Sequence, residues 1–188
     1  MDLTKIVNEV LTLFGRPTVA NINDDDAAKR LLESTKSLLT IQLSEYNWSF
    51  AIKSEVLSRE VNAVSPRFKY AYALPGKMLR RINAYKFYYD SKNVAKRQSK
   101  MRLGDYVIED YLCTNSDNVM LQYVTSQPDL SDKSAMFNRA LEYLVASENA
   151  IHLTENVNLK ALFDKQSQIY LNKAKLLDFN NHSDAMRY

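Results

Sequence analysis

The sequence predicts an α+β protein: a four-helix bundle with a small antiparallel β-sheet or barrel inserted between its second and third helices. Two patterns predict this. Apolar residues recur every three or four positions near the start of the chain and again after Pro128, which is typical of amphipathic helices. Between these parts, β-branched and aromatic residues alternate in short runs, which is typical of strands. This order, with helices first, then about five strands and then helices again, differs from the alternation of strands and helices in a parallel α/β protein.

The predicted bundle comprises residues 1–48 and 129–180, and the predicted β subdomain comprises residues 49–128. Residues 181–188 are polar and are expected to form a flexible tail. A length of 188 residues suits one domain carrying an inserted subdomain.

The first two helices have clear boundaries in the sequence. The first is expected to run from Leu3 to Phe14, with Gly15 as its C-terminal cap and Pro17 preventing its continuation. The segment 23–26, Asn-Asp-Asp-Asp, offers an N-cap and first-turn acids for the second helix, which should reach about Tyr46.

The middle of the chain is predicted to hold the strands. They are expected at 50–58, 68–74, 81–89, 105–114 and 118–125. The second of these should break at Leu74-Pro75 into one helical turn, and residues 115–118 should form a turn between the last two strands. The basic segment 91–102 is expected to be a hairpin tip or a mobile loop.

Helices return near the C-terminus. Asp132 is a candidate N-cap for a third helix that carries apolar residues from Met136 to Ile151. The fourth helix is expected to begin near Thr154, with Glu155 in its first turn.

Five residues mark the predicted change from helix to sheet. The only tryptophan, Trp48, and Phe50 are interpreted as an aromatic anchor in the core, because such rings bury a large area. Tyr72, Leu74 and Pro75 mark the end of the second predicted strand. We therefore treat these positions as a structural junction rather than a ligand site.

The composition argues against several classes of enzyme. The three glycines, at positions 15, 76 and 104, are far apart, whereas loops that hold phosphates need clustered glycines. A single cysteine excludes an internal disulfide and a cysteine-based zinc site. No apolar run is long enough to cross a membrane, and the first residues do not match a secretory signal. We therefore expect no cofactor, no metal and no membrane partner.

Individual reactive residues have simpler structural explanations. Cys113 with His152 or His182 matches no nucleophile motif, so we expect a structural cysteine. The acidic run at 24–26 is better explained by helix capping than by cation binding. Carboxylate pairs of the kind used by glycosidases are conceivable at 109–110 or at Glu55 and Glu60, although acids are common on strand edges.

The strongest local signal is a cluster of basic residues. The net charge is only +3, but residues 77–102 hold nine lysines and arginines and one acid, Asp90. Phosphates or an acidic partner are the candidate ligands of five of the basic residues: Lys92, Lys96, Arg97, Lys100 and Arg102. Tyr85, Phe87, Tyr88 and Tyr89 lie beside them and could stack on single-stranded bases, although packing within the sheet is the better explanation.

The order of several short motifs resembles the head-to-tail adaptor family of tailed bacteriophages, the group of tail tubular protein A and the P22-type tail accessory factor. The resemblance extends over nearly the whole chain. The motifs that carry it are Val10-Leu11-x-x-Phe14-Gly15-x-Pro17, Trp48-Ser49-Phe50-Ala51, Tyr70-Ala71-Tyr72-Ala73-Leu74-Pro75, Met78-Leu79-Arg80-Arg81-Ile82, Val119-Met120-Leu121-Gln122-Tyr123 and Phe137-x-x-Ala140-Leu141-x-x-Leu144.

The resemblance implies a structural protein of the virion neck, assembled in the infected bacterium. It implies a dodecameric ring that joins the portal protein to the tail nozzle or tube and lets DNA pass through its lumen. It implies no enzymatic activity. The chain departs from the family at Gly76-Lys77, where a carboxylate often follows Leu-Pro, and in the basic segment 91–102.

Two other functions stay open from the sequence. One is a nucleic-acid-binding module that uses the basic face of residues 77–102. The other is a peptidoglycan hydrolase, for which no acidic motif can be transferred from the family.

Overall fold

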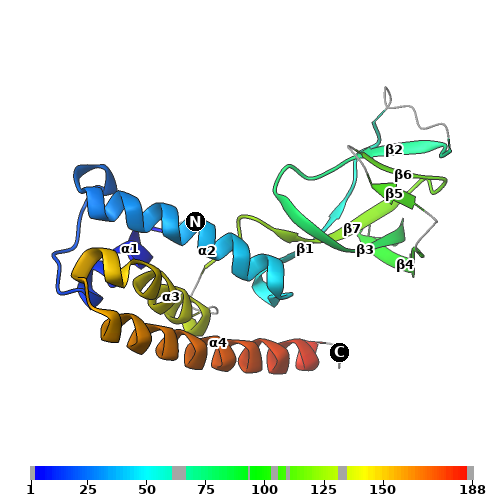
Figure 1. Cartoon of the computed structure of the whole chain (residues 1–188). Helices are drawn as coiled ribbons and strands as arrows, with labels where there is room; N and C mark the ends of the chain where they lie inside the picture. The colour runs from blue at the N-terminus through cyan, green and yellow to red at the C-terminus, as the bar shows by residue number, and fades with distance from the viewer. Residues whose placement is uncertain are drawn as a thin grey trace. The chain divides into compact units, whose positions relative to one another are not determined.

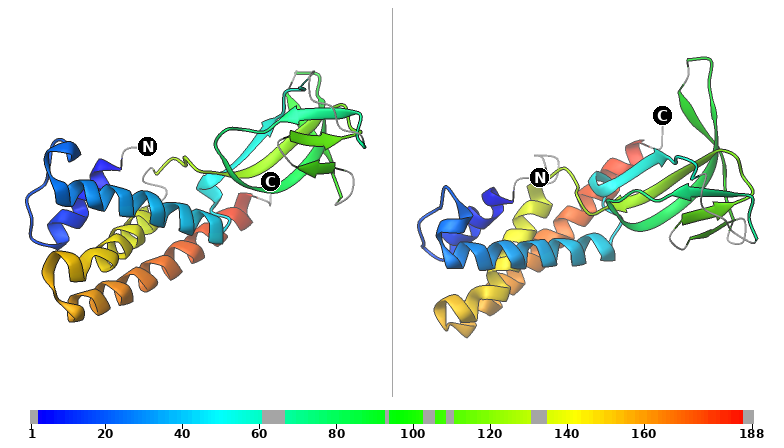
Figure 2. Two further views of the ribbon diagram at one scale, coloured as in Figure 1. Left: turned by 45° about the horizontal axis from the view of Figure 1, so that its top comes forward. Right: turned by 90° about the horizontal axis from the view of Figure 1, so that it is seen from above.

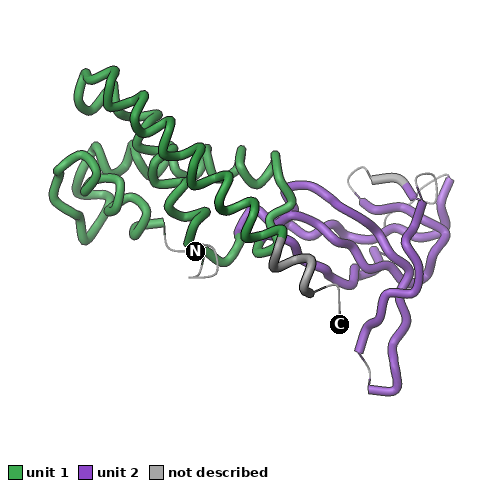
Figure 3. The backbone as a smooth tube through the Cα atoms, turned by 90° about the horizontal axis from the view of Figure 1, so that it is seen from below, with its two compact units in different colours: residues 1–50, 128–188 green, residues 51–127 purple. Residues whose placement is uncertain are grey.

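The computed structural model describes residues 3–60, 67–92, 94–102, 106–108, 111–130 and 135–185. The chain divides into two compact units (Figure 3). Residues 1–50 and 128–188 form the helical unit, and residues 51–127 form the β unit. The prediction of a mixed α+β protein with four α-helices and antiparallel sheet is confirmed (Figure 1).

Helix α1 spans Thr4–Leu13 and ends as predicted at Gly15. Gly15 has φ +68°, a left-handed conformation that a glycine adopts without steric cost. The Gly15 N–H donates to the Thr12 carbonyl at 2.9 Å, and the Arg16 N–H donates to the Leu11 carbonyl at 2.9 Å. These two bonds make a Schellman cap, which satisfies carbonyls at the end of the helix.

Helix α2 spans Asp26–Glu45 and is capped within the predicted acidic run. The short 3₁₀ helix η1 (Ile22–Asp24) precedes it. The Asp25 carboxylate accepts a hydrogen bond from the Ala28 N–H at 2.7 Å, so Asp25 is the N-cap. Because it caps the helix, the acidic run is accounted for without a cation.

Helix α3, Ala135–Thr154, is the central helix of its unit, since it contacts the other three helices. Figures 1 and 2 show it lying between α2 and α4. It buries residues around much of its circumference, and three of them are alanines, which allow close approach. The predicted cap Asp132 lies outside the described residues.

Helix α4 spans Val157–Ala185, so its predicted start near Thr154 was wrong. Glu155 has φ +54°, and this left-handed residue separates α3 from α4. Asn156 then caps α4, because its Oδ1 accepts from the Leu159 N–H at 3.1 Å. The helix continues beyond the predicted end at residue 180, so the predicted flexible tail is helical as far as Ala185.

The described part of the β unit contains seven strands in two antiparallel sheets. The four-stranded sheet has the order β1-β7-β3-β4, and the three-stranded sheet has the order β2-β6-β5. The strands are β1 (Ile52–Val56), β2 (Tyr70–Ala73), β3 (Met78–Tyr89), β4 (Ala95–Lys100), β5 (Tyr106–Ile108), β6 (Tyr111–Thr114) and β7 (Val119–Thr125).

Three details of the predicted strands were wrong. The expected helical turn after Leu74-Pro75 is a tight turn, closed by the Met78 N–H and the Pro75 carbonyl at 2.9 Å, and β3 begins there. The basic segment 91–102 begins in a hairpin tip, as one of its two predicted forms, but it continues as strand β4. The single strand expected at 105–114 is two paired strands, β5 and β6. The turn at 115–118 does connect two strands, but they belong to different sheets.

The core of the β unit contains residues of both sheets. Its buried cluster combines Leu121 and Tyr123 of the larger sheet with Tyr72 and Leu112 of the smaller one. Tyr70, Leu74, Met78 and Tyr106 pack against this cluster. Inward-facing apolar residues therefore hold the two sheets together.

Candidate interaction surfaces

Strands β3 and β4 form a hairpin that extends away from the rest of the β unit (Figures 2 and 3). We call residues 85–100 the arm. Asp90 organises its turn, because its Oδ1 accepts from the N–H groups of Lys92 and Val94, both at 2.9 Å. The single acid of the basic cluster at 77–102 therefore has a structural role.

A β-bulge gives the arm two different faces. Lys86 pairs with Ser99 and Phe87 pairs with Arg97, which leaves Gln98 as an extra residue in β4. Residues paired across antiparallel strands share a face. Tyr85, Phe87 and Tyr89 therefore share one face with Lys100, Arg97 and Ala95, and we call this the aromatic face. Lys86, Tyr88, Lys96 and Ser99 share the other, which we call the lysine face.

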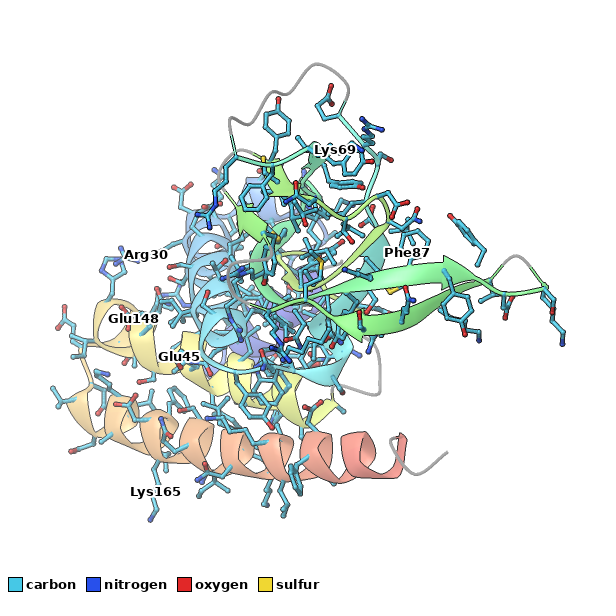
Figure 4. All side chains as sticks on the ribbon, turned by 90° about the vertical axis from the view of Figure 1, so that its right-hand side faces the viewer. Arg30, Glu45, Lys69, Phe87, Glu148 and Lys165 are labelled. Carbon is cyan, nitrogen blue, oxygen red and sulfur yellow. The ribbon has the colours of Figure 1, made fainter. Side chains whose placement is uncertain are left out.

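The aromatic face is held by internal contacts. Phe87 is 5% exposed and meets Tyr89 edge-to-face, with their ring centroids 5.2 Å apart. The Arg97 guanidinium lies over the Tyr85 ring at 4.7 Å and donates to the Ser54 Oγ at 2.7 Å. Arg97, a predicted ligand contact, therefore also has a structural role in the sheet. Figure 4 labels Phe87 on the extended hairpin.

The lysine face is open to solvent. Tyr88 is 51% exposed, and two exposed lysines are its neighbours: Lys86 on the same strand and Lys96 opposite on β4. Lys96 lies 3.9 Å from Asp90, a distance that corresponds to a weak surface ion pair. Lys92, also exposed, occupies the turn. The lysine face and the turn together thus present three lysines and one tyrosine outward.

The five predicted contact residues therefore do not share one face of the hairpin. Lys92 and Lys96 lie with the turn and the lysine face, whereas Arg97 and Lys100 lie on the aromatic face. Arg102 is exposed and follows the buried Met101. Lys86 was counted in the basic cluster 77–102 but not among the five contact residues; the period-two alternation of β3 was the signal that could have added it.

The predicted structural junction separates into two sets. Trp48 is 1% exposed, and its ring centroid lies 4.8 Å from Phe137 and 5.6 Å from Phe50, all within the helical unit. Tyr72 belongs to the β unit, where its hydroxyl donates to the Ser116 carbonyl at 2.9 Å. Leu74 and Pro75 also belong to the β unit, where they are half-buried.

Helix α4 presents a second surface. Leu162, Ile169 and Leu176 recur every seven residues and are 50%, 37% and 62% exposed. They lie on the opposite side of α4 from its buried residues, such as Phe163 and Ala174. We call these three residues the outer stripe. Lys165, on the same side, points away from the other helices in Figure 4.

The two units carry opposite charge. The β unit has 13 basic and 7 acidic residues, a formal net charge of +6. The helical unit has 12 basic and 15 acidic residues, a formal net charge of −3. The modest total of +3 therefore conceals a strong segregation of charge.

The residues considered for catalysis either have structural partners or belong to different units. His152 accepts a hydrogen bond from the Arg30 guanidinium at 2.8 Å in the helical unit, whereas Cys113 is half-buried in β6 of the β unit. His182 lies among residues whose side chains are not described.

Glu55, a candidate catalytic acid, is held by Tyr123. Its carboxylate accepts from the Tyr123 hydroxyl at 2.8 Å. Burial, together with this bond and the nearby negative charge, raises the pKa of Tyr123 to about 12. The Glu60 N–H donates to the Ala71 carbonyl, and residues 109 and 110 lie outside the described part of the chain.

Within the described ranges, no group of three or more histidine, cysteine, aspartate or glutamate side chains is arranged to hold a metal ion. The helices in those ranges also lack the combination of length and apolar character needed to cross a bilayer. The chain matches no protein-family model, and a search of curated proteins returns no match.

Proposed function

We propose that this chain is a structural subunit of a head-to-tail adaptor ring in a tailed bacteriophage. In this proposal the four helices form a bundle, the β unit is inserted between its second and third helices, and neither part is catalytic. The ring, expected to be a dodecamer, connects the portal protein with the tail nozzle or tube. It resides in the virion neck and allows genome ejection. The order of sequence motifs supports this proposal.

The outer stripe of α4 is the observation that carries the proposal. A helix with one apolar side needs one packing partner, whereas α4 has apolar residues on two opposite sides. One side meets α3, which supplies the partner within the chain. The stripe of Leu162, Ile169 and Leu176 has the seven-residue spacing of helices that pack side by side. We therefore assign it to contact with a neighbouring copy.

The arrangement of the helical unit suits a ring. Helices α2 and α4 lie on opposite sides of α3 (Figure 1). If the outer side of α4 meets a different side of the next subunit, the contact is heterologous, and repetition around an axis closes a ring. The helical unit has more acidic than basic residues, so a basic side chain such as Lys165 can meet acidic residues of the neighbouring copy.

Native mass spectrometry of the purified chain, alone and with its portal protein, tests the proposal. We expect rings with the portal, visible by negative-stain microscopy. Replacing Leu162, Ile169 and Leu176 with glutamine should abolish the rings without unfolding the chain, because these side chains contribute little to the isolated fold. The matched control replaces three other exposed apolar residues, Met136, Ile151 and Val157, with glutamine. Absence of rings with the unaltered chain, or equal loss in both variants, would contradict the proposal.

A nucleic-acid-binding module is the second candidate, and the arm is the observation that favours it. The two candidates are compatible, since DNA passes through the proposed ring. The third possibility, a peptidoglycan hydrolase, requires clearing of cell walls that is lost when one carboxylate is replaced.

A further inference from the structure

We propose that the lysine face of the arm and the adjoining turn bind the phosphate backbone of DNA without reading its sequence. The contacts are Lys86, Lys96 and the turn residue Lys92, with the exposed Tyr88 two residues from Lys86 on β3 and opposite Lys96 on β4. This inference refines the proposed function, because it names where passing DNA is contacted, but its experiment uses the isolated chain and does not require a ring.

Charge and geometry favour a polyanion. The only acid between residues 77 and 102 is Asp90, and its carboxylate is engaged with the backbone of the turn. Even with the weak Lys96–Asp90 pair, nine basic residues between 77 and 102 therefore stand against one acid in that range. An ammonium group carries three donors on a flexible stem, which lets it contact phosphates in many positions.

Protection of a sheet edge does not account for all the lysines. Lysine on an edge strand prevents pairing with another chain, and this explanation fits Lys96 on the edge strand β4. Lys86 instead lies on β3, which is paired on both sides, and Lys92 lies in the turn. These two lysines have no edge to protect, so they are the ones that distinguish binding from edge protection.

The bulge places the stabilising contacts and the proposed binding contacts of the arm on different faces. Because of the extra residue Gln98, Arg97 faces Tyr85 and holds the sheet, while Lys96 points to the other face. Tyr88 is the exposed aromatic ring on the binding face, and it can stack on an unpaired base, as aromatic residues do in single-strand binding proteins.

The test measures fluorescence anisotropy with a labelled duplex and a labelled single strand of unrelated sequences over a range of salt. The arm variant is Lys86→Gln, Lys92→Gln and Lys96→Gln together. The control variant, Lys29→Gln, Lys36→Gln and Lys53→Gln, removes the same charge from exposed positions outside the arm. Circular dichroism confirms that both variants are folded.

We expect the unaltered chain to bind both DNAs, with affinity that falls as salt rises. Each phosphate contact contributes about 0.9 to the logarithmic salt slope on duplex DNA, so three lysines contribute roughly 2.7. Between 50 and 200 mM salt this slope corresponds to an affinity loss of about 40-fold. The arm variant should lack this part of the slope, whereas the control should retain it.

Tyr88→Ala separates the two DNA forms. We expect at least a fivefold loss of single-strand affinity, roughly the lower limit for stacking, and little change with the duplex. Tyr89→Ala is the matched control, because Tyr89 is 56% exposed on the opposite face. If Tyr88→Ala weakens binding to both DNA forms equally, Tyr88 contacts the DNA backbone, and the proposed lysine site still stands.

Three outcomes would overturn the inference. They are absence of binding to either DNA at 50 mM salt, equal losses in the arm and control variants, and binding of poly-glutamate as tight as that of DNA. The last result would assign the arm to an acidic protein partner. None of these outcomes bears on whether rings form, so this inference and the proposed function can fail separately.

Discussion

The helical unit and the β unit bury polar groups differently. Six of the eight polar residues buried in the described chain lie in the helical unit: Thr35, Glu142, Ser147, Asn149, Ser167 and Asp178. Each has a hydrogen-bond partner. Among the described residues of the β unit, buried polarity is limited to two threonines and to tyrosine hydroxyls at the core boundary.

This difference shows what fixes each unit. Helices sliding over one another can exchange apolar contacts at little cost, whereas a buried polar group must keep its partner. In the helical unit, Ser147 of α3 donates to Asp164 of α4, and Asp178 of α4 accepts from Ser49, so these bonds favour one packing of that unit. In the β unit, backbone ladders set the strand positions, so side-chain polarity is less necessary.

The largest expected effect comes from Trp48→Ala. The ring is 1% exposed, contacts Tyr46, Phe50 and Phe137, and donates from Nε1 to the Gln42 carbonyl at 3.1 Å. We expect a loss of about 3–5 kcal/mol in the free energy of unfolding, measured by far-UV circular dichroism in urea. Phe179→Ala, at a side chain 64% exposed, is the control and should change it by less than about 0.5 kcal/mol. Equal effects would mean that the aromatic cluster does not hold the helical unit.

Asp178→Ala tests the buried polar groups. The Asp178 carboxylate, on α4, accepts from the Ser49 N–H at 3.0 Å and from the Ser49 hydroxyl at 2.5 Å. Removing it leaves a partly buried N–H unpaired, so we expect a loss of about 1–3 kcal/mol. The fluorescence of Trp48, next to Ser49 in the sequence, reports the transition. Asp26→Ala, which removes an exposed carboxylate, should have a much smaller effect.

Tyr123→Phe tests the β unit. Loss of the bond to Glu55 should lower the free energy of unfolding by about 1 kcal/mol near neutral pH. The folded pKa, about 12, is above the ordinary 10.0, so the stability linked to this group is retained below pH 10 and lost as pH rises toward 12. Ultraviolet titration should show one phenolate step fewer near pH 12 in the variant. If the missing step is instead near pH 10, the hydroxyl is not held as described.

Glu142→Gln should have the smallest effect. Burial raises the pKa of Glu142, although Arg139 opposes that rise by donating at 2.7 Å. The stability linked to a raised carboxyl pKa is present below the ordinary value of 4.5 and is lost as pH rises through the folded pKa.

The Glu142→Gln variant should therefore be as stable as the unaltered chain at pH 7, or more stable by less than about 1 kcal/mol. Urea unfolding at pH 4.5 and pH 7 measures the difference, and Glu148→Gln, exposed on the same helix, is the control. A loss above about 1 kcal/mol at pH 7 would show that the ion pair outweighs burial.

The helical unit was more predictable from sequence than the β unit. The cap at Gly15 and the capping run at 24–26 require specific residue types, so they could be recognised. The start of α4 could not, because Glu155 adopts a left-handed conformation that no residue preference indicates. The exposure of the outer stripe of α4 was also not predicted. Apolar residues at a helical spacing are typical of a buried side, and only the packing of the helices shows which side is buried.

In the β unit, strand β4 was missed because its residues are charged or polar and nearly all exposed. Such a strand has no alternation in hydropathy, and only pairing with β3 defines it. The candidate site could be anticipated as a cluster of positive charge. Its division between two faces depends on one bulge, which the sequence does not reveal.

The extra residue in β4 also bears on how the arm can change. Side chains along a strand alternate sides, so a pairing that placed Gln98 opposite Phe87 in a regular ladder would reverse the sides of every residue between Gln98 and the turn. Arg97 would then leave the aromatic face, and Lys96 would join it. A shift of one residue in register could thus exchange the surface offered to a ligand for the one that stabilises the hairpin, with no amino acid changed.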